Sequence, residues 1–178
     1  MHRIGLLLKF GIDQIIGKLK RRSALSINPH IQSAQNVSII CPPGNKAVQC
    51  KEQINQLISI FTGKNINIFH HNPELPADED LFRSSQISIN LPSLSLWEAL
   101  NTPALAAIDK MECDLLINID PDDKLIYHYI KKRLKPTFTA SISTKSENRD
   151  ANFVFNIISE QLDVSLQSFC NFLQSVLL

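Results

Sequence analysis

Short apolar runs alternate along the chain with longer segments in which apolar residues recur at helical spacing. The short runs predict six strands: VSIIC (37–41), NINIF (65–69), QISINL (86–91), CDLLINI (113–119), PTFTAS (136–141) and NFVFNI (152–157). The helical spacing predicts helices within 48–61, 125–134 and 162–176. Strands that alternate with helices are typical of βαβ units, so the pattern indicates an α/β fold.

The expected fold is a single doubly wound, mostly parallel, Rossmann-like sheet over residues 36–178, with helices on both faces. A chain of 178 residues, of which 44% are hydrophobic, fits one such domain. Right-handed crossovers favour the strand order 3-2-1-4-5, with the sixth run beside the fifth. No helical pattern separates the fifth and sixth runs, so the direction of the last strand stays open.

Residues 1–25 carry a different pattern, an apolar stripe at helical spacing bordered by basic residues. The stripe consists of Ile4, Leu7, Leu8, Ile12, Ile15, Ile16 and Leu19. This pattern predicts a basic amphipathic helix over 1–25. The polar residues that follow, with Pro29 among them, predict a linker over 26–35.

The charge of the chain changes sign after this segment. Residues 1–25 contain six basic residues and one acidic residue; removing them from the chain totals of 18 and 17 leaves 12 and 16. The remainder is therefore net negative, and the basic character belongs to the N-terminal segment.

An apolar stripe of this kind needs a surface that covers it. The predicted partner-binding residues are Ile4, Leu8, Ile12, Ile15, Lys18, Lys20, Arg21 and Arg22. A protein partner or a second copy is favoured over an anionic membrane, and a membrane over nucleic acid, because most amphipathic helices pack against protein. Four scattered cysteines and the lack of a signal-peptide pattern predict a cytoplasmic protein, with peripheral binding to the inner face of the membrane as the alternative.

Ligands of doubly wound sheets bind beyond the carboxyl ends of the strands, so the loops after the first and fourth runs form the candidate cleft. Its residues are Gly44, Asn45, Asn118 and Asp120. The first loop, CPPGNKAVQC, has one glycine and so lacks both the phosphate-binding loop and the dinucleotide fingerprint. We interpret Asn45 as a helix cap after a Pro-Pro-Gly turn, with weak anion binding as the alternative.

The carboxylates in NIDPDDK invite a metal interpretation, but their spacing favours capping. Asp120 followed by Pro121 predicts an N-cap and a first helical residue. The negative charges of Asp122 and Asp123 would then lie in the first turn, where the helix dipole stabilises them. The adjacent histidines 70 and 71 would point to opposite sides of a strand, which disfavours a shared metal ion. The sequence therefore predicts no metal, no cofactor and no catalytic residue.

Several segments together carry a resemblance to a known group of proteins. The basic N-terminal helix, LPSLSLWEALNTP, CDLLINIDPDDKLIYHYIKKRLKPTFTAS and NFVFNI resemble an uncharacterised family of short bacterial α/β proteins. This resemblance implies architecture and no activity. SIICPPGN and CDLLINID are also similar to the first domain of the ADP-heptose lipopolysaccharide heptosyltransferases. Where those enzymes place a loop aspartate regarded as catalytic, this chain has Asn45, which cannot act as a general base.

The pattern thus favours a non-catalytic binding or adaptor module that engages a partner, or forms oligomers, through its N-terminal helix. The alternative is a small ligand-binding domain or an enzyme related to the N-terminal half of a glycosyltransferase. Such a domain would use the candidate cleft at the strand ends.

Overall fold

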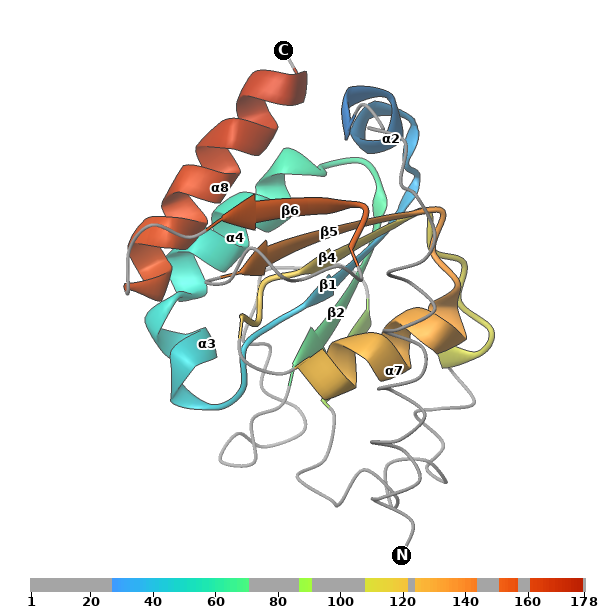
Figure 1. Cartoon of the computed structure of the whole chain (residues 1–178), viewed down its shortest axis with the longest axis horizontal. Helices are drawn as coiled ribbons and strands as arrows, with labels where there is room; N and C mark the ends of the chain where they lie inside the picture. The colour runs from blue at the N-terminus through green and yellow to red at the C-terminus, as the bar shows by residue number, and fades with distance from the viewer. Residues whose placement is uncertain are drawn as a thin grey trace, which may run out of the picture.

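The computed structural model describes residues 27–70, 87–90, 108–121, 124–143, 151–156 and 161–177. Within these residues, six strands form one sheet in the order β3-β2-β1-β4-β5-β6, and every neighbouring pair is parallel. The predicted doubly wound order is therefore confirmed. The last strand, whose direction the sequence left open, runs parallel to the fifth (Figure 1).

The six predicted strands and the three helices predicted between and after them all appear, with small shifts at their ends. The strands are β1 (Asn36–Ile40), β2 (Asn65–His70), β3 (Ile87–Asn90), β4 (Leu115–Asn118), β5 (Phe138–Ser143) and β6 (Phe153–Asn156). The helices are α2 (Ile27–Ser33), α3 (Asn45–Gln49), α4 (Lys51–Ile60), α7 (Lys124–Leu134) and α8 (Leu162–Leu177). The first helical pattern is divided at Cys50 into α3 and α4.

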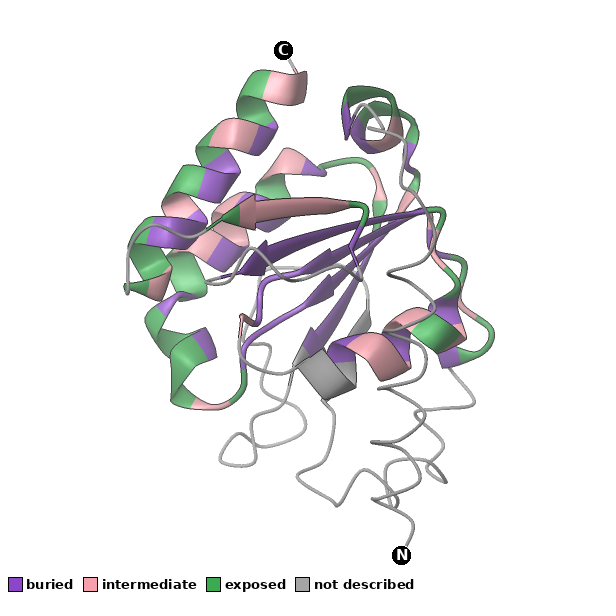
Figure 2. Cartoon of the chain, viewed as in Figure 1, coloured by how far each residue is buried: buried purple, intermediate pink, exposed green. Residues whose placement is uncertain are grey.

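Helices cover both faces of the sheet, as expected. Alternate residues of a strand point to opposite faces, so Val37 and Ile39 face α2, α3, α4 and α8, whereas Ile40 faces α7. Figure 2 shows the central strands buried between these two layers. Burial on both faces suits the three apolar residues that begin β4, whereas β1 and β5 also bury serine and threonine side chains among their apolar residues.

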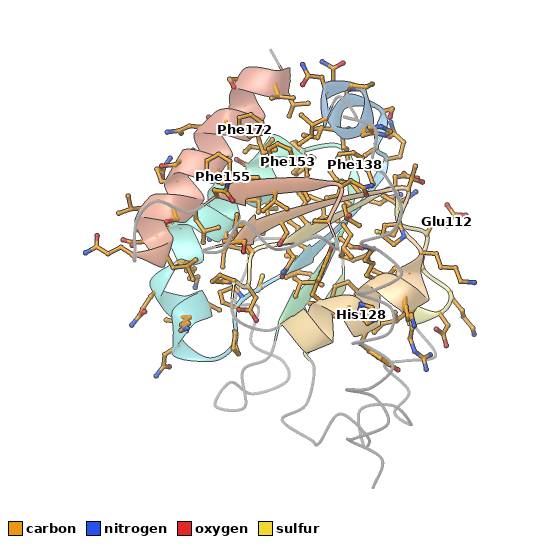
Figure 3. All side chains as sticks on the ribbon, viewed as in Figure 1. Glu112, His128, Phe138, Phe153, Phe155 and Phe172 are labelled. Atoms are coloured by element: carbon orange, nitrogen blue, oxygen red, sulfur yellow. The ribbon has the colours of Figure 1, made fainter. Side chains whose placement is uncertain are left out.

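Two sets of contacts hold β6 in place. Asn152 accepts hydrogen bonds from the backbone N–H and the hydroxyl of Thr139 (2.9 and 2.8 Å), and its own N–H donates to that hydroxyl (2.9 Å). The ring of Phe153 stacks on Phe172 of α8, and Phe155 lies against the same ring, with centroids 5.2 and 5.7 Å apart (Figure 3). The hydrogen bonds set the register with β5, and the rings attach the strand to α8.

The predicted linker over 26–35 is wrong, because Ile27–Ser33 forms α2. Ile27 and Ile31 lie one turn apart and are both buried in the core that α8 covers, while Asn28 and Pro29 are exposed. Pro29 lies in the first turn, where its missing N–H breaks no intrahelical hydrogen bond. This polar stretch thus contains a short amphipathic helix, and α2 is part of the α/β body. The predicted helix over 1–25 lies outside the described residues.

A polar network joins α2 to the end of the sheet at which the strands begin, called here the amino end. The Asp114 carboxylate, just before β4, accepts hydrogen bonds from the backbone N–H groups of Gln35 and Asn36 (both 2.9 Å) and from the Asn36 side chain (3.2 Å). Its backbone N–H donates to the Asn36 carbonyl, and its carbonyl accepts from the N–H of Phe138 (both 2.9 Å). One residue therefore connects the starts of β1, β4 and β5.

Lys64 binds the C-terminal end of α2, where the turn between α2 and β1 begins. Its ammonium group donates to the carbonyl oxygens of Ile31, Gln32 and Ala34 at 3.2, 3.0 and 2.5 Å. These carbonyls lie at the C-terminal end of α2, where a positive charge is favourable. The hydrogen bonds from Asn36 and Gln35, assisted by the Lys64 charge, hold the pKa of Asp114 below its ordinary value of 3.8.

We predict that Asp114→Ala lowers the free energy of unfolding at neutral pH by about 1–2 kcal/mol, because three hydrogen bonds to a half-buried carboxylate are lost. Folding lowers the pKa of Asp114, so the ionised carboxylate contributes its full stabilisation of the fold when the pH is above the ordinary pKa. This contribution is lost as the pH falls through the lowered pKa of the folded protein. Urea unfolding of both proteins from neutral to acidic pH measures the difference. A difference that stays constant into the acid range would contradict this origin.

Candidate functional site at the carboxyl end of the sheet

The candidate site lies where the order of the strands reverses. From β1 the chain continues to β2 and β3 on one side, and it then returns to β4 on the other side of β1. The loops after β1 and β4 therefore leave the sheet at its carboxyl end and diverge, which is the usual ligand position in a doubly wound sheet. Gly44 and Asn45 follow β1, and Asn118 and Asp120 end and follow β4.

Asn45 does not cap α3, contrary to the prediction. It is the first residue of α3 and is exposed, and the N-cap is Gly44, which makes no side-chain cap. Gly44 has φ +56° and ψ −136°, a backbone conformation that an L side chain rarely adopts, and its carbonyl accepts a hydrogen bond from Ala47 (3.1 Å). The glycine is therefore required by the turn itself. With only five residues, α3 offers a weak dipole to an anion.

The side chain of Asn118, the last residue of β4, binds mainly to the backbone of the turn that follows the strand. The side-chain amide of Asn118 donates to the carbonyl of Asp120 (3.0 Å) and to the hydroxyl of Ser141 (3.3 Å), and its oxygen accepts from the N–H of Asp120 (3.1 Å). Asn118, Asp120 and Ser141 are all buried, at 2%, 5% and 0% exposure. The Asn118 amide is thus fully used in holding the turn after β4.

Asp120 is not the N-cap of the following helix, so this prediction was wrong as well. Helix α7 begins at Lys124, four residues later, while Asp120 is buried in the turn that Asn118 closes. The paired hydrogen bonds between the Asn118 side chain and the Asp120 backbone keep this residue out of the helix. Asp122 and Asp123 lie outside the described residues.

Burial makes the thiols of this chain poor nucleophiles. Cys41, directly after β1, is buried; its burial, then the charge of Asp120, then Cys50 raise its pKa far above the ordinary range. Burial likewise raises the pKa of Cys113 and of Cys170 to about 11, and burial followed by the charge of Asp163 raises that of Cys50. Because the thiolate is the reactive form, none of the four is suited to nucleophilic catalysis.

Sequence reasoning missed Ser141 and Cys41 at this end of the sheet. Ser141 is the register partner of Asn118 in the parallel pair of β4 and β5, so aligning CDLLIN with TFTAS would have brought the two together. His128 is half-buried on α7. Residue 70 ends β2, but its side chain and residue 71 lie outside the described part of the chain.

Among the described residues, no group of three or more His, Cys, Asp or Glu side chains is arranged to hold a metal ion. None of the described helices is both long and apolar enough to cross a membrane.

Neither the scan against protein-family models nor the search of curated proteins finds a match to the chain. The two resemblances drawn from the sequence therefore stay predictions.

We predict that Asn118→Ala lowers the free energy of unfolding by about 2–3 kcal/mol, because it leaves buried backbone groups of Asp120 without their partners. The matched control is Asn156→Ala, at the exposed end of β6, for which we expect a change below about 0.5 kcal/mol. Urea unfolding measures both. Equal losses in the two variants would show that the amide of Asn118 is not what holds the turn.

Proposed function

We propose that the chain is a non-catalytic binding module, in which the α/β body presents the basic amphipathic segment of residues 1–25 to a protein partner. A second copy of the chain is the simplest such partner, because closed dimers are the commonest assemblies. The observation that most supports the proposal is α2. Ile27 and Ile31 fix this helix to the core, and Lys64 holds its C-terminal end.

The anchoring of α2 matters because it determines how the segment is attached. A flexible linker would allow the apolar stripe to sample a large volume around the body, whereas attachment through the fixed helix α2 keeps the stripe near one end of the body. Confinement reduces the entropy lost when the stripe docks, so the same apolar area gives tighter binding.

The carboxyl end of the sheet supports the non-catalytic part of the proposal. Asn118 is used in the turn after β4, Gly44 serves the turn before α3, and the buried thiol of Cys41 has a raised pKa. Each of these groups has a structural role that explains its presence. The proposal includes a cytoplasmic location, since a reducing compartment suits four buried free thiols.

A small ligand-binding domain is the second candidate, and one observation favours it. Asp120 is 5% exposed at the point where the strand order reverses, so a buried carboxylate lies at the usual ligand position of a doubly wound sheet. A ligand at this place would contact the turns after β1 and β4. The similarity to heptosyltransferases suggests a nucleotide sugar, although Asn45 stands at the position of their loop aspartate.

We predict that Leu8→Asp in the full chain disrupts the assembly, because a carboxylate in the middle of the apolar stripe costs at least about 2 kcal/mol in a buried interface. Leu6→Asp is the matched control: it makes the same substitution, but at helical spacing Leu6 lies opposite the stripe. Size-exclusion chromatography with light scattering should give a smaller species for Leu8→Asp alone. Identical elution of both variants and the native chain would contradict the proposal.

The ligand-binding alternative is tested by a separate measurement, the change in melting temperature when a ligand is added. Thermal shift with nucleotides, nucleotide sugars and sugar phosphates should leave the melting temperature unchanged if the module is non-catalytic. Micromolar binding of one of them that Gly44→Val abolishes would favour the alternative, because this substitution strains the turn after β1.

A further inference from the structure

The sheet ends at β6, which has a hydrogen-bonded neighbour on one side only among the described strands. No hydrogen bond joins the outer side of β6 to any other described segment. Folded proteins usually protect such an edge with a charged residue, a proline or a bulge. Residues 151–156 (ANFVFN) contain no charged residue and no proline, and β6 keeps a regular register with β5. The described part of this edge therefore lacks these protections.

Three phenyl rings fill the angle between β6 and α8, and none of them is fully buried. The ring of Phe172 in α8 stacks on Phe153 and lies beside Phe155 (Figure 3). The Phe155 ring also contacts Phe169, with centroids 5.4 Å apart. Phe169 is completely buried, whereas the other three rings are half-buried and are called here the aromatic seam. Aromatic side chains that keep exposed area are among those that contribute most to protein interfaces.

The helix beside the aromatic seam carries almost no charge. Of the 16 residues of α8, Asp163 is the single charged one, whereas four of the 11 residues of α7 are lysine or arginine. Ser168 and Ser175 are exposed and lie on the same side of α8 as Phe172, from which they are four and three residues away. Their hydroxyls donate to carbonyls of the helix itself, at 3.0 and 2.7 Å. This side of α8 can therefore be covered without leaving a charge or a hydroxyl donor unpaired.

Beyond the proposed function, we propose that β6 and the aromatic seam bind a second copy of the chain across a two-fold axis, with the two β6 strands side by side and antiparallel. The two sheets join into one continuous sheet, and the rings of both copies are covered together. This contact is separate from the one that residues 1–25 make in the proposed function.

A second copy fits this surface better than a partner with charged side chains. Such a partner would bury its charges against an uncharged side of α8, where they find no counter-charge. The chain itself offers an uncharged helix side, half-buried rings and an unpaired strand edge. In a symmetric dimer the same patch meets itself, so all three features are matched at once. Two short strands form few hydrogen bonds, so the strands set the orientation and the rings supply most of the binding.

The spacing of strands and helices agrees with this arrangement. Paired strands lie about 4.8 Å apart and packed helices about 8–10 Å apart, which is close to two strand spacings. Because its phenyl rings lie against those of β6, α8 covers the last strands of the sheet (Figure 1). A two-fold axis perpendicular to the sheet keeps both copies of α8 on the same face. The two helices then meet at packing distance beside the paired strands.

The test uses two variants of the full chain that add the same side chain to different sides of α8. Ser168→Arg places an arginine beside Phe172, where the copies meet, and Gln174→Arg places it on the side of α8 away from Phe172. Both positions are exposed, and arginine favours a helix at least as well as either residue that it replaces. Both variants should therefore fold, which circular dichroism checks.

Light scattering against protein concentration measures the dimer. One helix about 24 Å long and one short strand make a small contact, so we expect a dissociation constant in the micromolar range. Ser168→Arg should weaken the dimer at least about 30-fold, because two like charges meet where the surface is uncharged. Gln174→Arg should change the dissociation constant less than about twofold. Equal effects of the two variants would overturn the proposal.

The same measurements in the Leu8→Asp chain separate this contact from the proposed function, whose contact through residues 1–25 that substitution disrupts. A Leu8→Asp chain that still forms dimers, which Ser168→Arg dissociates and Gln174→Arg does not, supports the contact through β6. This result stands whether or not Leu8→Asp changes the assembly of the native chain. A Leu8→Asp chain that is monomeric at about 100 μM would overturn the proposal.

Amide hydrogen exchange tests the pairing of the strands. Alternate residues of β6 direct their N–H groups toward β5 and toward the outer side. Both sets should exchange slowly in the native dimer, and Ser168→Arg should speed the exchange of the outer set alone. Rapid exchange of the outer set in the native dimer would overturn the proposal. Slow exchange of that set in a monomer would overturn it in favour of another segment of this chain as the occupant.

Discussion

The carboxylate of Asp114 accepts the backbone N–H groups of Gln35 and Asn36, while its own peptide groups bond to Asn36 and Phe138. These contacts align the starts of β1, β4 and β5, and they fix the turn that leads out of α2. Parallel strands have no hairpins to set their register, so a side chain that bridges three strand starts has a large effect on the whole sheet. The position of α2 follows from this turn, and the place where the N-terminal segment meets the body follows from α2.

The two ends of the sheet thereby differ in character. At the carboxyl end, polar groups are buried and directed to neighbouring backbone, as in the hydrogen bonds between Asn118 and Asp120. At the amino end, Lys132 and Lys135 are exposed at the C-terminal end of α7. The buried polar groups at the usual ligand position of a doubly wound sheet are thus largely used by the turns of the chain itself. This contrast is the physical basis for proposing a binding module and not an enzyme.

The sequence was sufficient to predict the strands and their order, but it did not predict the conformations of the turns after β1 and β4. Short β-rich runs and helical spacing predicted the six strands, and right-handed crossovers predicted their order. The caps at Asn45 and Asp120 were wrongly predicted, since local capping preferences compete with tertiary contacts such as those of Asn118. Helix α2 was missed because only Ile27 and Ile31 mark its buried side. Asp114 and Ser141 act across strands, so no local pattern could reveal them.

The central claim is that residues 1–25 connect to the body through α2, at the amino end of the sheet. Double electron–electron resonance tests it with one spin label at Ser23→Cys and a second at either Lys135→Cys or Lys51→Cys. The native thiols are buried and have raised pKa values, so the labels attach to the introduced cysteines. The account predicts a shorter distance from position 23 to position 135 than to position 51. Equal distances, or a shorter distance to position 51, would contradict it.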